Sequence, residues 1–237
     1  MSLLSICQDA ASQLGLRQPT TVVGSTDLTA QILYRLANQA GKELARYHDW
    51  NDLIVEQTFT TLAQNEQTDA LDPDDFDRLI RNVEMWNRTN DLRYSGPTTQ
   101  RIWQQLQTSI VTGGLVGWWR VRGGQLLIHP APTAGETLAF EYVSKRWARS
   151  SGGDAQEKFL ADTDTTVLDE DLITLEIVWR FRQTRGFPQY AEDMATCERE
   201  KEKAASRDRG TGRIRPENGN RTTDWPPYPT WVGTIEG

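Results

Sequence analysis

Apolar residues in the first fifty positions recur three and four residues apart, which is the spacing of one helix face. The first stripe predicts a short helix that stops at Gly15, and the second predicts a long helix capped by Ser25, Thr26 or Asp27. We expect Trp50 to fold back onto these helices. The stripes consist of Leu3, Ile6, Cys7, Ala10 and Leu14, then Leu28, Ile32, Leu33, Leu36, Ala37, Ala40, Leu44 and Tyr47.

The period then changes to the alternation of β-strands. The glycines of Gly123-Gly124 lie between two apolar runs and predict a tight hairpin turn. One short helix, Gln100 to Gln107, interrupts this region because Ile102, Trp103 and Leu106 share a helical face. The expected strands are Val55 to Thr61, Leu79 to Trp86, Trp118 to Val121, Leu126 to Ile128 and Leu138 to Val143.

Helical spacing returns after the polar break "ARSSGGDAQEKF". A helix capped by Asp164 carries apolar residues on two faces, so we expect it to be buried on both sides and to end at Gly186. A last helix follows Pro188 and runs to about Arg209. Its first half is amphipathic through Tyr190, Ala191, Met194 and Cys197. Its second half, "EREKEKAASRDR", lacks an apolar stripe and is expected to project into solvent or against a charged partner.

This order predicts an α+β fold in which N- and C-terminal helices form a bundle, with an inserted antiparallel β domain and an extended C-terminal tail. The expected divisions are residues 1–54 and 151–209 for the two parts of the helical bundle, 55–150 for the β-rich domain, and 210–237 for a partner-binding tail.

Composition narrows the class of protein. The 237 residues carry a net charge of −7, so binding of a phosphate backbone by the whole surface is not the default. No apolar run reaches the length of a membrane helix, and the start lacks the pattern of a signal peptide, so we expect no membrane association. Cys7 and Cys197 are far apart and are expected to be buried thiols in a reducing cytoplasm.

The residues that carry chemistry are scattered. His48 and His129 lie in different predicted modules, and with two distant cysteines they cannot make a zinc spacing. The loop "DPDDFD" lacks the oxygen ligand, Gly and Glu that a calcium loop needs at its later positions. Phosphate-binding and nucleophile motifs are also missing from the sequence. We therefore predict no enzyme activity, no cofactor and no metal.

Two weaker signals point elsewhere. The pair Trp118-Trp119 could stack on a sugar ring beside two carboxylates, which makes a sugar-binding or sugar-cleaving tail component the alternative function. Alternation along a strand instead places one Trp in the core. Arg180, Arg182 and Arg185 could form a nucleic-acid patch, although pairing with neighbouring acids is the simpler expectation.

The final stretch, "RPENGNRTTDWPPYPTWVGTIEG", combines large apolar residues with prolines that no helix interior or central strand accepts. Such a segment cannot bury its own aromatic side chains, and aromatic residues are typical anchors of protein interfaces. We therefore predict that it lies along a partner protein. The predicted contact residues are Arg213, Arg215, Trp225, Tyr228, Trp231 and Ile235.

Four motifs in their order resemble the head-to-tail adaptor proteins of tailed bacteriophages, of the tail tubular protein A type. They are "CQDAASQLGL", "ELARYHDWNDLIVEQTFTT", "LDPDDFDRLI" and "WWRVRGGQLLIHPAPTAGETLAFEYVS", and the resemblance covers roughly Ser2 to Arg209.

The resemblance implies a virion structural protein of the phage neck, assembled in the host cytoplasm. Such adaptors form a homo-oligomeric ring, usually of twelve subunits, below the portal protein. The ring lines the channel through which the genome DNA passes without sequence-specific binding, and it seats the nozzle or another downstream tail protein. The C-terminal extension docks on the portal, which would give the predicted tail its partner.

Overall fold

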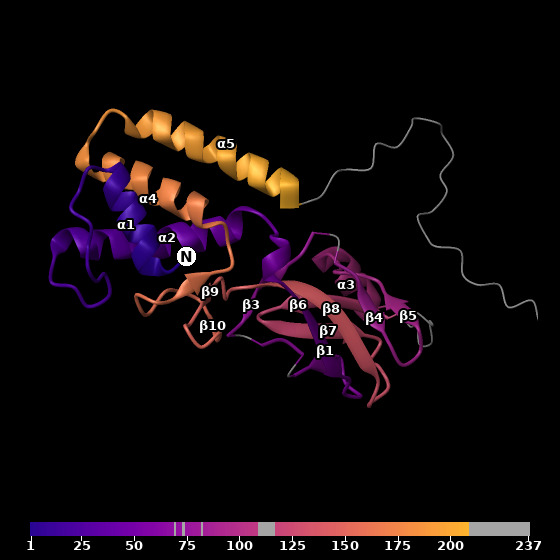
Figure 1. Cartoon of the computed structure of the whole chain (residues 1–237). Coiled ribbons are helices and arrows are strands. Elements are labelled where there is room, and N and C mark those ends of the chain that lie inside the picture. The colour runs from indigo at the N-terminus through magenta and orange to yellow at the C-terminus, as the bar shows by residue number, and fades with distance from the viewer. Residues whose placement is uncertain (69, 73, 82, 109–116, 209–237) are drawn as a thin grey trace, which may run out of the picture.

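A computed structural model describes residues 1–68, 70–72, 74–81, 83–108 and 117–208 (Figure 1). These residues form helices and antiparallel sheets, so the predicted mixture of α and β structure is confirmed. The molecule is elongated, with most of the helices at one end and most of the strands at the other. We call these ends the helical lobe (α1, α2, α4, α5) and the sheet lobe (β1–β8 and α3).

The helical lobe contains α1 (Leu3–Gln13), α2 (Leu28–Tyr47), α4 (Glu170–Arg185) and α5 (Tyr190–Asp208). Asp27 caps α2 by accepting hydrogen bonds from the backbone N–H groups of Thr29 and Ala30, as one of the three predicted caps. Gly186 ends α4 in the left-handed conformation, with φ at 72°. None of the helices described is long and apolar enough to cross a membrane.

The predicted cap at Asp164 is wrong. Asp169 caps α4 instead, by accepting from the backbone N–H of Asp171. Asp164 is buried, and its carboxylate accepts hydrogen bonds from the N–H groups of Leu160 and Ala161 at 2.6 and 2.8 Å. This carboxylate therefore organises the loop before α4 rather than the helix itself.

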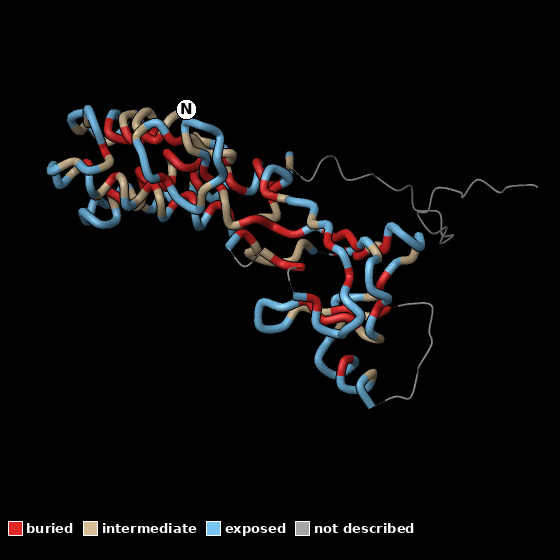
Figure 2. The backbone as a smooth tube through the Cα atoms, turned by 90° about the horizontal axis from the view of Figure 1, so that it is seen from below, coloured by how far each residue is buried: buried red, intermediate tan, exposed pale blue. Residues whose placement is uncertain are grey.

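Helix α4 lies at the centre of the helical lobe and contacts α1, α2 and α5. Both of its apolar faces are buried, as predicted. Trp50 also joins this core, where its indole N–H donates to the carbonyl of Leu44 at 2.7 Å. Segments from both ends of the described chain therefore share one buried core, which Figure 2 shows as a run of red tube through the helices.

The sheet lobe contains two antiparallel sheets and α3 (Gln100–Thr108). The larger sheet has the order β1-β8-β4-β5, and β3 also pairs with β8. Its strands are β1 (Ile54–Thr60), β3 (Phe76–Leu79), β4 (Met85–Asn87), β5 (Leu92–Tyr94) and β8 (Thr137–Ser144). The smaller sheet has the order β2-β7-β6, from β2 (Glu66–Gln67), β6 (Trp118–Arg122) and β7 (Gln125–His129).

A short connection and a third sheet lie between the main elements. The 3₁₀ turn η1 (Asn51–Leu53) joins α2 to β1. The sheet β10-β9-β11 is formed by β9 (Ala148–Arg149), β10 (Ala155–Gln156) and β11 (Thr165–Thr166). Ala148 of β9 belongs to the core of the helices, so this sheet extends the helical lobe.

The predicted strand from Leu79 to Trp86 is wrong, because the chain breaks it into β3 and β4. Both strands pair with β8, with Leu79 opposite Tyr142 and Trp86 opposite Ala139. Between them, the backbone N–H of Arg81 donates to the Asp49 carboxylate at 3.2 Å instead of to a strand. The ladder is thus interrupted where the chain contacts Asp49, two residues after α2.

The hairpin β6–β7 turns at Gly123 and Gly124, as predicted, and both have positive φ, at 61° and 76°. Its inner face meets the larger sheet in a second core. Trp119 is fully buried there, and its ring centroid lies 6.0 Å from that of Phe140. The buried members of this core are Phe59, Ala70, Leu71, Val83, Met85, Tyr94, Trp119, Leu126, Ile128, Leu138, Phe140 and Tyr142.

Helix α5 departs in part from the burial expected from its sequence, although Cys197 of the predicted stripe is buried. Ala191 and Met194, on the stripe predicted to pack, are exposed, whereas Lys201, Ala204 and Ala205 in the charged half are buried. The prediction that this half projects into solvent is therefore wrong. Two small alanines and one lysine with a buried partner make its packing face, and none of them adds to an apolar stripe of large residues.

Candidate partner-binding site

The six predicted contact residues of the tail, Arg213, Arg215, Trp225, Tyr228, Trp231 and Ile235, lie outside the described residues. The last described residue before them is Asp208, which is also the last residue of α5. The candidate site is therefore built from the end of α5 and the surfaces around it.

Asp208 is tied to the connection between α2 and β1. The backbone N–H of Asn51 donates to the Asp208 carboxylate at 3.2 Å, and the Asn51 side-chain amide donates to the Asp208 carbonyl at 2.7 Å. The Nε2 atom of His48 lies 3.2 Å from the same carboxylate. The end of α5 is thus held at the junction of the two lobes.

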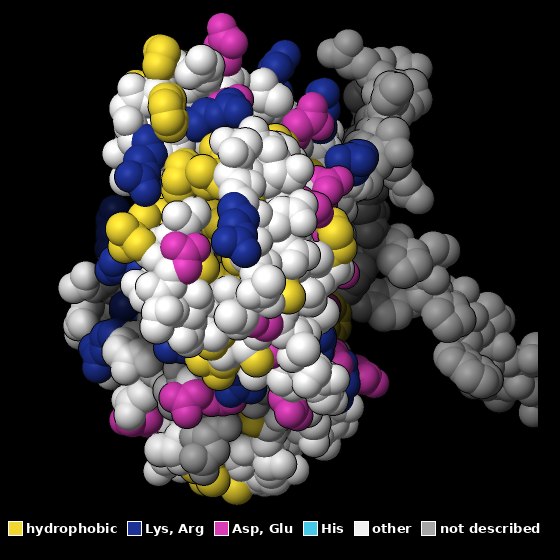
Figure 3. All heavy atoms as spheres, turned by 60° about the vertical axis from the view of Figure 1, so that its left-hand side comes forward, with side chains coloured by type: hydrophobic (Ala, Val, Ile, Leu, Met, Phe, Trp, Pro, Cys, Tyr) yellow, Lys and Arg dark blue, Asp and Glu magenta, His cyan; other side chains and the backbone are white. Residues whose placement is uncertain are grey.

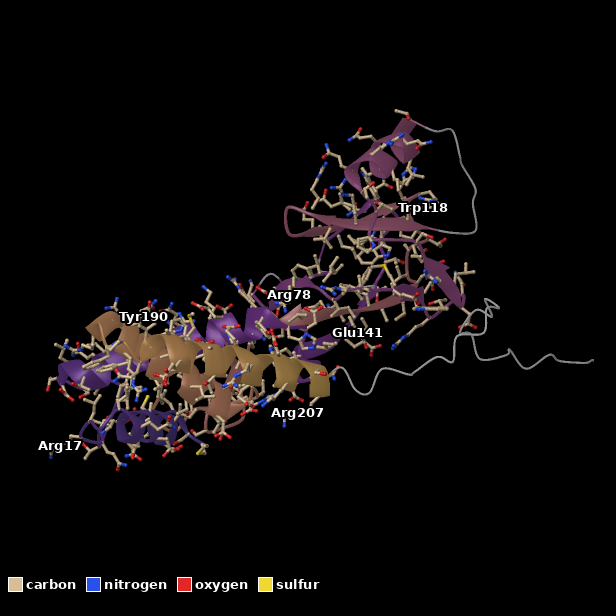
Figure 4. All side chains as sticks on the ribbon, turned by 90° about the horizontal axis from the view of Figure 1, so that it is seen from above. Arg17, Arg78, Trp118, Glu141, Tyr190 and Arg207 are labelled. Atoms are coloured by element: carbon tan, nitrogen blue, oxygen red, sulfur yellow. The ribbon has the colours of Figure 1, made fainter. Side chains whose placement is uncertain are left out.

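Two hollows lie at this junction. One, of about 480 Å³, includes His48, Asn51 and Asp208 in its wall. The other, of about 520 Å³, lies between α2 and the segment around Trp147 and Lys158. Arg46 lines both hollows. Figure 4 shows Arg78 and Arg207 on the elements around this junction.

A buried ionic network fixes α5 on α4 and so places Asp208. Glu176 is 1% exposed and accepts hydrogen bonds from Trp179 Nε1 at 3.0 Å, Arg180 Nε at 2.8 Å and Lys201 Nζ at 2.8 Å. Burial alone would raise the pKa of Glu176. The Lys201 hydrogen bond and the nearby charges outweigh burial and hold that pKa below its ordinary value.

Lys201 shows the complementary effect. Its burial would lower its pKa, but its hydrogen bonds to Glu176 and Glu198 raise the pKa above the ordinary value. Both groups are therefore charged at neutral pH, and each satisfies the other in the interior. A second ion pair of α5, between Glu200 and Lys203, forms at 2.8 Å on its exposed face.

The residues examined for chemistry are kept apart. Cys7 lies on α1 and Cys197 on α5, both buried and free, as predicted. Burial raises the pKa of each thiol to about 12, so neither is a nucleophile at neutral pH. Over the ranges that the structure describes, no group of three or more His, Cys, Asp or Glu residues could hold a metal ion.

Two of the three arginines on α4 pair with neighbouring acids, as expected from the sequence. Arg180 bridges Glu176 and Glu43, and Arg182 pairs with Asp193. Arg185 instead lies over the Phe181 ring, with its guanidinium carbon 5.3 Å from the ring centroid. These three side chains therefore do not form a free nucleic-acid patch.

Sequence reasoning missed Asn51, Glu176, Lys201 and Asp208 as the residues that hold the end of α5. Only the i,i+3 pair Glu198–Lys201 gave a local signal for any of them. No protein-family model matches this chain, and no curated protein matches it.

Proposed function

We propose that this protein is a virion structural protein, a ring-forming head-to-tail adaptor of a tailed bacteriophage. Its ring, of twelve subunits, docks under the portal, lines the DNA channel and seats the next tail component. The protein would be assembled in the host cytoplasm and reside in the neck of the virion.

The observation that supports this proposal best is the anchoring of Asp208. A last described helix that is held through both Glu176 and Asn51 can present the following segment from a defined position. We propose that the helices form the bundle of the adaptor, that the β domain is its insertion, and that residues 210–237 are its portal-binding tail. In an extended, polyproline-like path of about 3.1 Å per residue these 28 residues would reach roughly 87 Å, enough to cross a neighbouring subunit.

The alternative of a sugar-binding or sugar-cleaving component has less support. Trp119 is fully buried in the core of the sheet lobe and cannot stack on a sugar. Trp118 retains some exposure, but its strand neighbours are Trp119 and, across the hairpin, His129, not a pair of carboxylates.

The test is co-sedimentation with portal-bearing capsids of the same phage. A chain ending at Arg209 keeps every contact described above, so it should melt like the full-length protein. It should nonetheless fail to attach to the capsids. Two tail variants separate the contacts: Trp225→Ala/Trp231→Ala should weaken attachment more than Arg213→Gln/Arg215→Gln, because buried aromatics dominate such interfaces.

Full-strength attachment by the truncated chain would contradict the tail contact and would move the portal site to the helices. If the full-length protein attaches neither to capsids nor to isolated portal in electron micrographs, the adaptor function itself is wrong.

A further inference from the structure

One surface of the sheet lobe differs from the rest of the molecule in charge. No Asp or Glu occurs from Ser95 to Gly135, although the average of 33 acids in 237 residues would place about six there. The same stretch holds Arg101, Arg120 and Arg122. In a chain of net charge −7, this segment is locally cationic.

The fold brings these arginines to one part of the lobe. In β6, Trp118, Arg120 and Arg122 alternate with the buried Trp119, so they occupy the outer face of the hairpin. His129 of β7 lies directly opposite Trp118 and shares that face. Figure 4 shows Trp118 in the lobe that lies away from α5.

Helix α3 covers part of this outer face. Trp103 of this helix is buried. Its ring centroid lies 6.1 Å from the centroid of the His129 ring and 5.8 Å from the guanidinium carbon of Arg120. Arg101 and the amides of α3 remain exposed beside it. Arg101 and Arg122 form no hydrogen bond or ion pair with the residues that the structure describes. The exposed amides are Gln100, Gln104, Gln105 and Gln107.

The nearest acid in this sheet is Glu66 of β2. Glu66 is opposite Leu127, and Leu127 is opposite Arg120, so Glu66 and Arg120 lie in one cross-strand row. They are two strands apart, about 10 Å at the usual strand spacing. The end of the helical lobe offers a contrast, because Figure 3 shows acidic and basic side chains mixed over that face.

We propose that this outer face, which we call the arginine face (Arg101, Arg120, Arg122 and the α3 amides), contacts the phosphate backbone of double-stranded DNA. Guanidinium groups bind phosphate oxygens in a bidentate manner, and glutamine amides are common phosphate donors. The lack of acids removes the repulsion that the rest of the surface would exert on DNA. The choice of ligand rests on the proposed function, because the ring would conduct the genome.

The test uses free full-length protein and a short fluorescein-labelled duplex, with binding followed by anisotropy over a salt series. Arg101→Gln/Arg122→Gln should reduce affinity about tenfold at low salt and flatten the dependence of log affinity on log salt by about two units. Both side chains are exposed, so the fold should be kept. Arg120 is left intact because it packs on Trp103.

The matched control is Arg17→Gln/Arg35→Gln, which removes two exposed arginines of the helical lobe and the same total charge. It should bind DNA like the wild type. Glu66→Gln tests whether negative charge beside the arginine face opposes DNA binding. It removes the one acid of the β2-β7-β6 strands and should raise the affinity for DNA twofold or more. The affinities for duplexes of different sequence should be equal.

Equal weakening by the two double variants would overturn the proposal, as would absence of wild-type binding at low salt. If Arg101→Gln/Arg122→Gln left DNA binding unchanged but reduced self-association in light scattering, the face would be a contact between copies instead. Co-sedimentation of Arg101→Gln/Arg122→Gln with capsids distinguishes the adaptor function from the DNA contact. If this variant attaches to capsids but does not bind DNA, the adaptor function is still supported.

Discussion

The two lobes hold their buried polar groups in different ways. In the helical lobe, the interior contains a charged pair, Glu176 and Lys201, whose members lie on different helices. In the sheet lobe, the buried amide of Gln67 is satisfied by the neutral backbone of Leu62, and Thr61 donates to the carbonyl of Thr133. At these positions the helical lobe pairs opposite charges between two helices, whereas the sheet lobe uses neutral hydrogen bonds to the backbone. The sheet lobe also buries one carboxylate, Asp75, which accepts from the Tyr142 hydroxyl at 2.6 Å.

The two lobes also share one packing feature. Each packs a buried tryptophan against a glycine. A Cβ added to Gly41 of α2 would lie 2.1 Å from the Trp147 ring, and one added to Gly96 would lie 2.5 Å from the Trp119 carbonyl oxygen. In the helical lobe, the glycine contacts only side-chain atoms of Trp147. In the sheet lobe, the glycine contacts both the backbone and the side chain of Trp119. The comparison predicts how each lobe responds when such a contact is changed.

The largest effect is expected for Lys201→Met. It removes one of the two cations that neutralise the buried Glu176 and leaves only Arg180, and breaking a buried ion pair in this way costs about 3 kcal/mol of unfolding free energy. The matched control Lys203→Met removes an exposed, solvent-screened pair and should leave the unfolding free energy nearly unchanged. Urea unfolding measures both variants.

The double variant Glu176→Gln/Lys201→Met should recover part of the loss, because no charge is then stranded between α4 and α5. A Lys201→Met variant as stable as Lys203→Met would show that the buried pair does not hold the helical lobe together.

A smaller loss, about 2 kcal/mol, is expected for Gly41→Ala, because the new methyl overlaps the Trp147 ring. In an unobstructed helix the same change would be favourable by about 1 kcal/mol. Gly41→Ala/Trp147→Phe should be more stable than Gly41→Ala alone, since the smaller ring makes room. Thermal melts followed by tryptophan fluorescence measure the effect.

In the sheet lobe, Gly96→Ala should be harder to rescue by a smaller ring at Trp119, because backbone is part of its obstruction. Gly152→Ala serves as the control, because its nearest contact is an ordinary 3.5 Å and its stability should hardly change. Equal melting of Gly41→Ala and Gly152→Ala would contradict the tight contact in α2.

The smallest expected effect is a dependence of the unfolding free energy on pH, which arises from the buried ion pair of the helical lobe. The pKa of Glu176 is lower in the folded protein than its ordinary value of 4.5, so its contribution is present above that value and is lost as pH falls through the folded pKa. The pKa of Lys201 is raised above 10.5, so its contribution is present below that value and is lost as pH rises through the folded pKa.

The stability difference between wild type and Lys201→Met should therefore shrink as pH falls below 4.5, because Glu176 becomes protonated. Melting at a series of pH values gives this difference. Constancy of the difference down to acid pH would mean that Glu176 does not depend on Lys201 for its charge.

Local signals were enough to predict much of the fold. The N-terminal helices, the cap at Asp27, the stop at Gly186 and the glycine turn of the β6–β7 hairpin all follow from residues within a few positions of one another. Their physical causes, which are capping hydrogen bonds, left-handed glycines and periodic apolar faces, act over the same short range.

Tertiary structure alone decided the features that depend on distant partners. Lys201 is buried because Glu176 meets it from another helix, and the strand expected from Leu79 to Trp86 breaks where Asp49 accepts the Arg81 N–H. Asp208, which begins the candidate site, is held by Asn51, which lies 157 positions earlier in the chain. A charged or polar side chain carries no periodic signal for burial, because its burial becomes favourable only when the fold delivers the group that satisfies it.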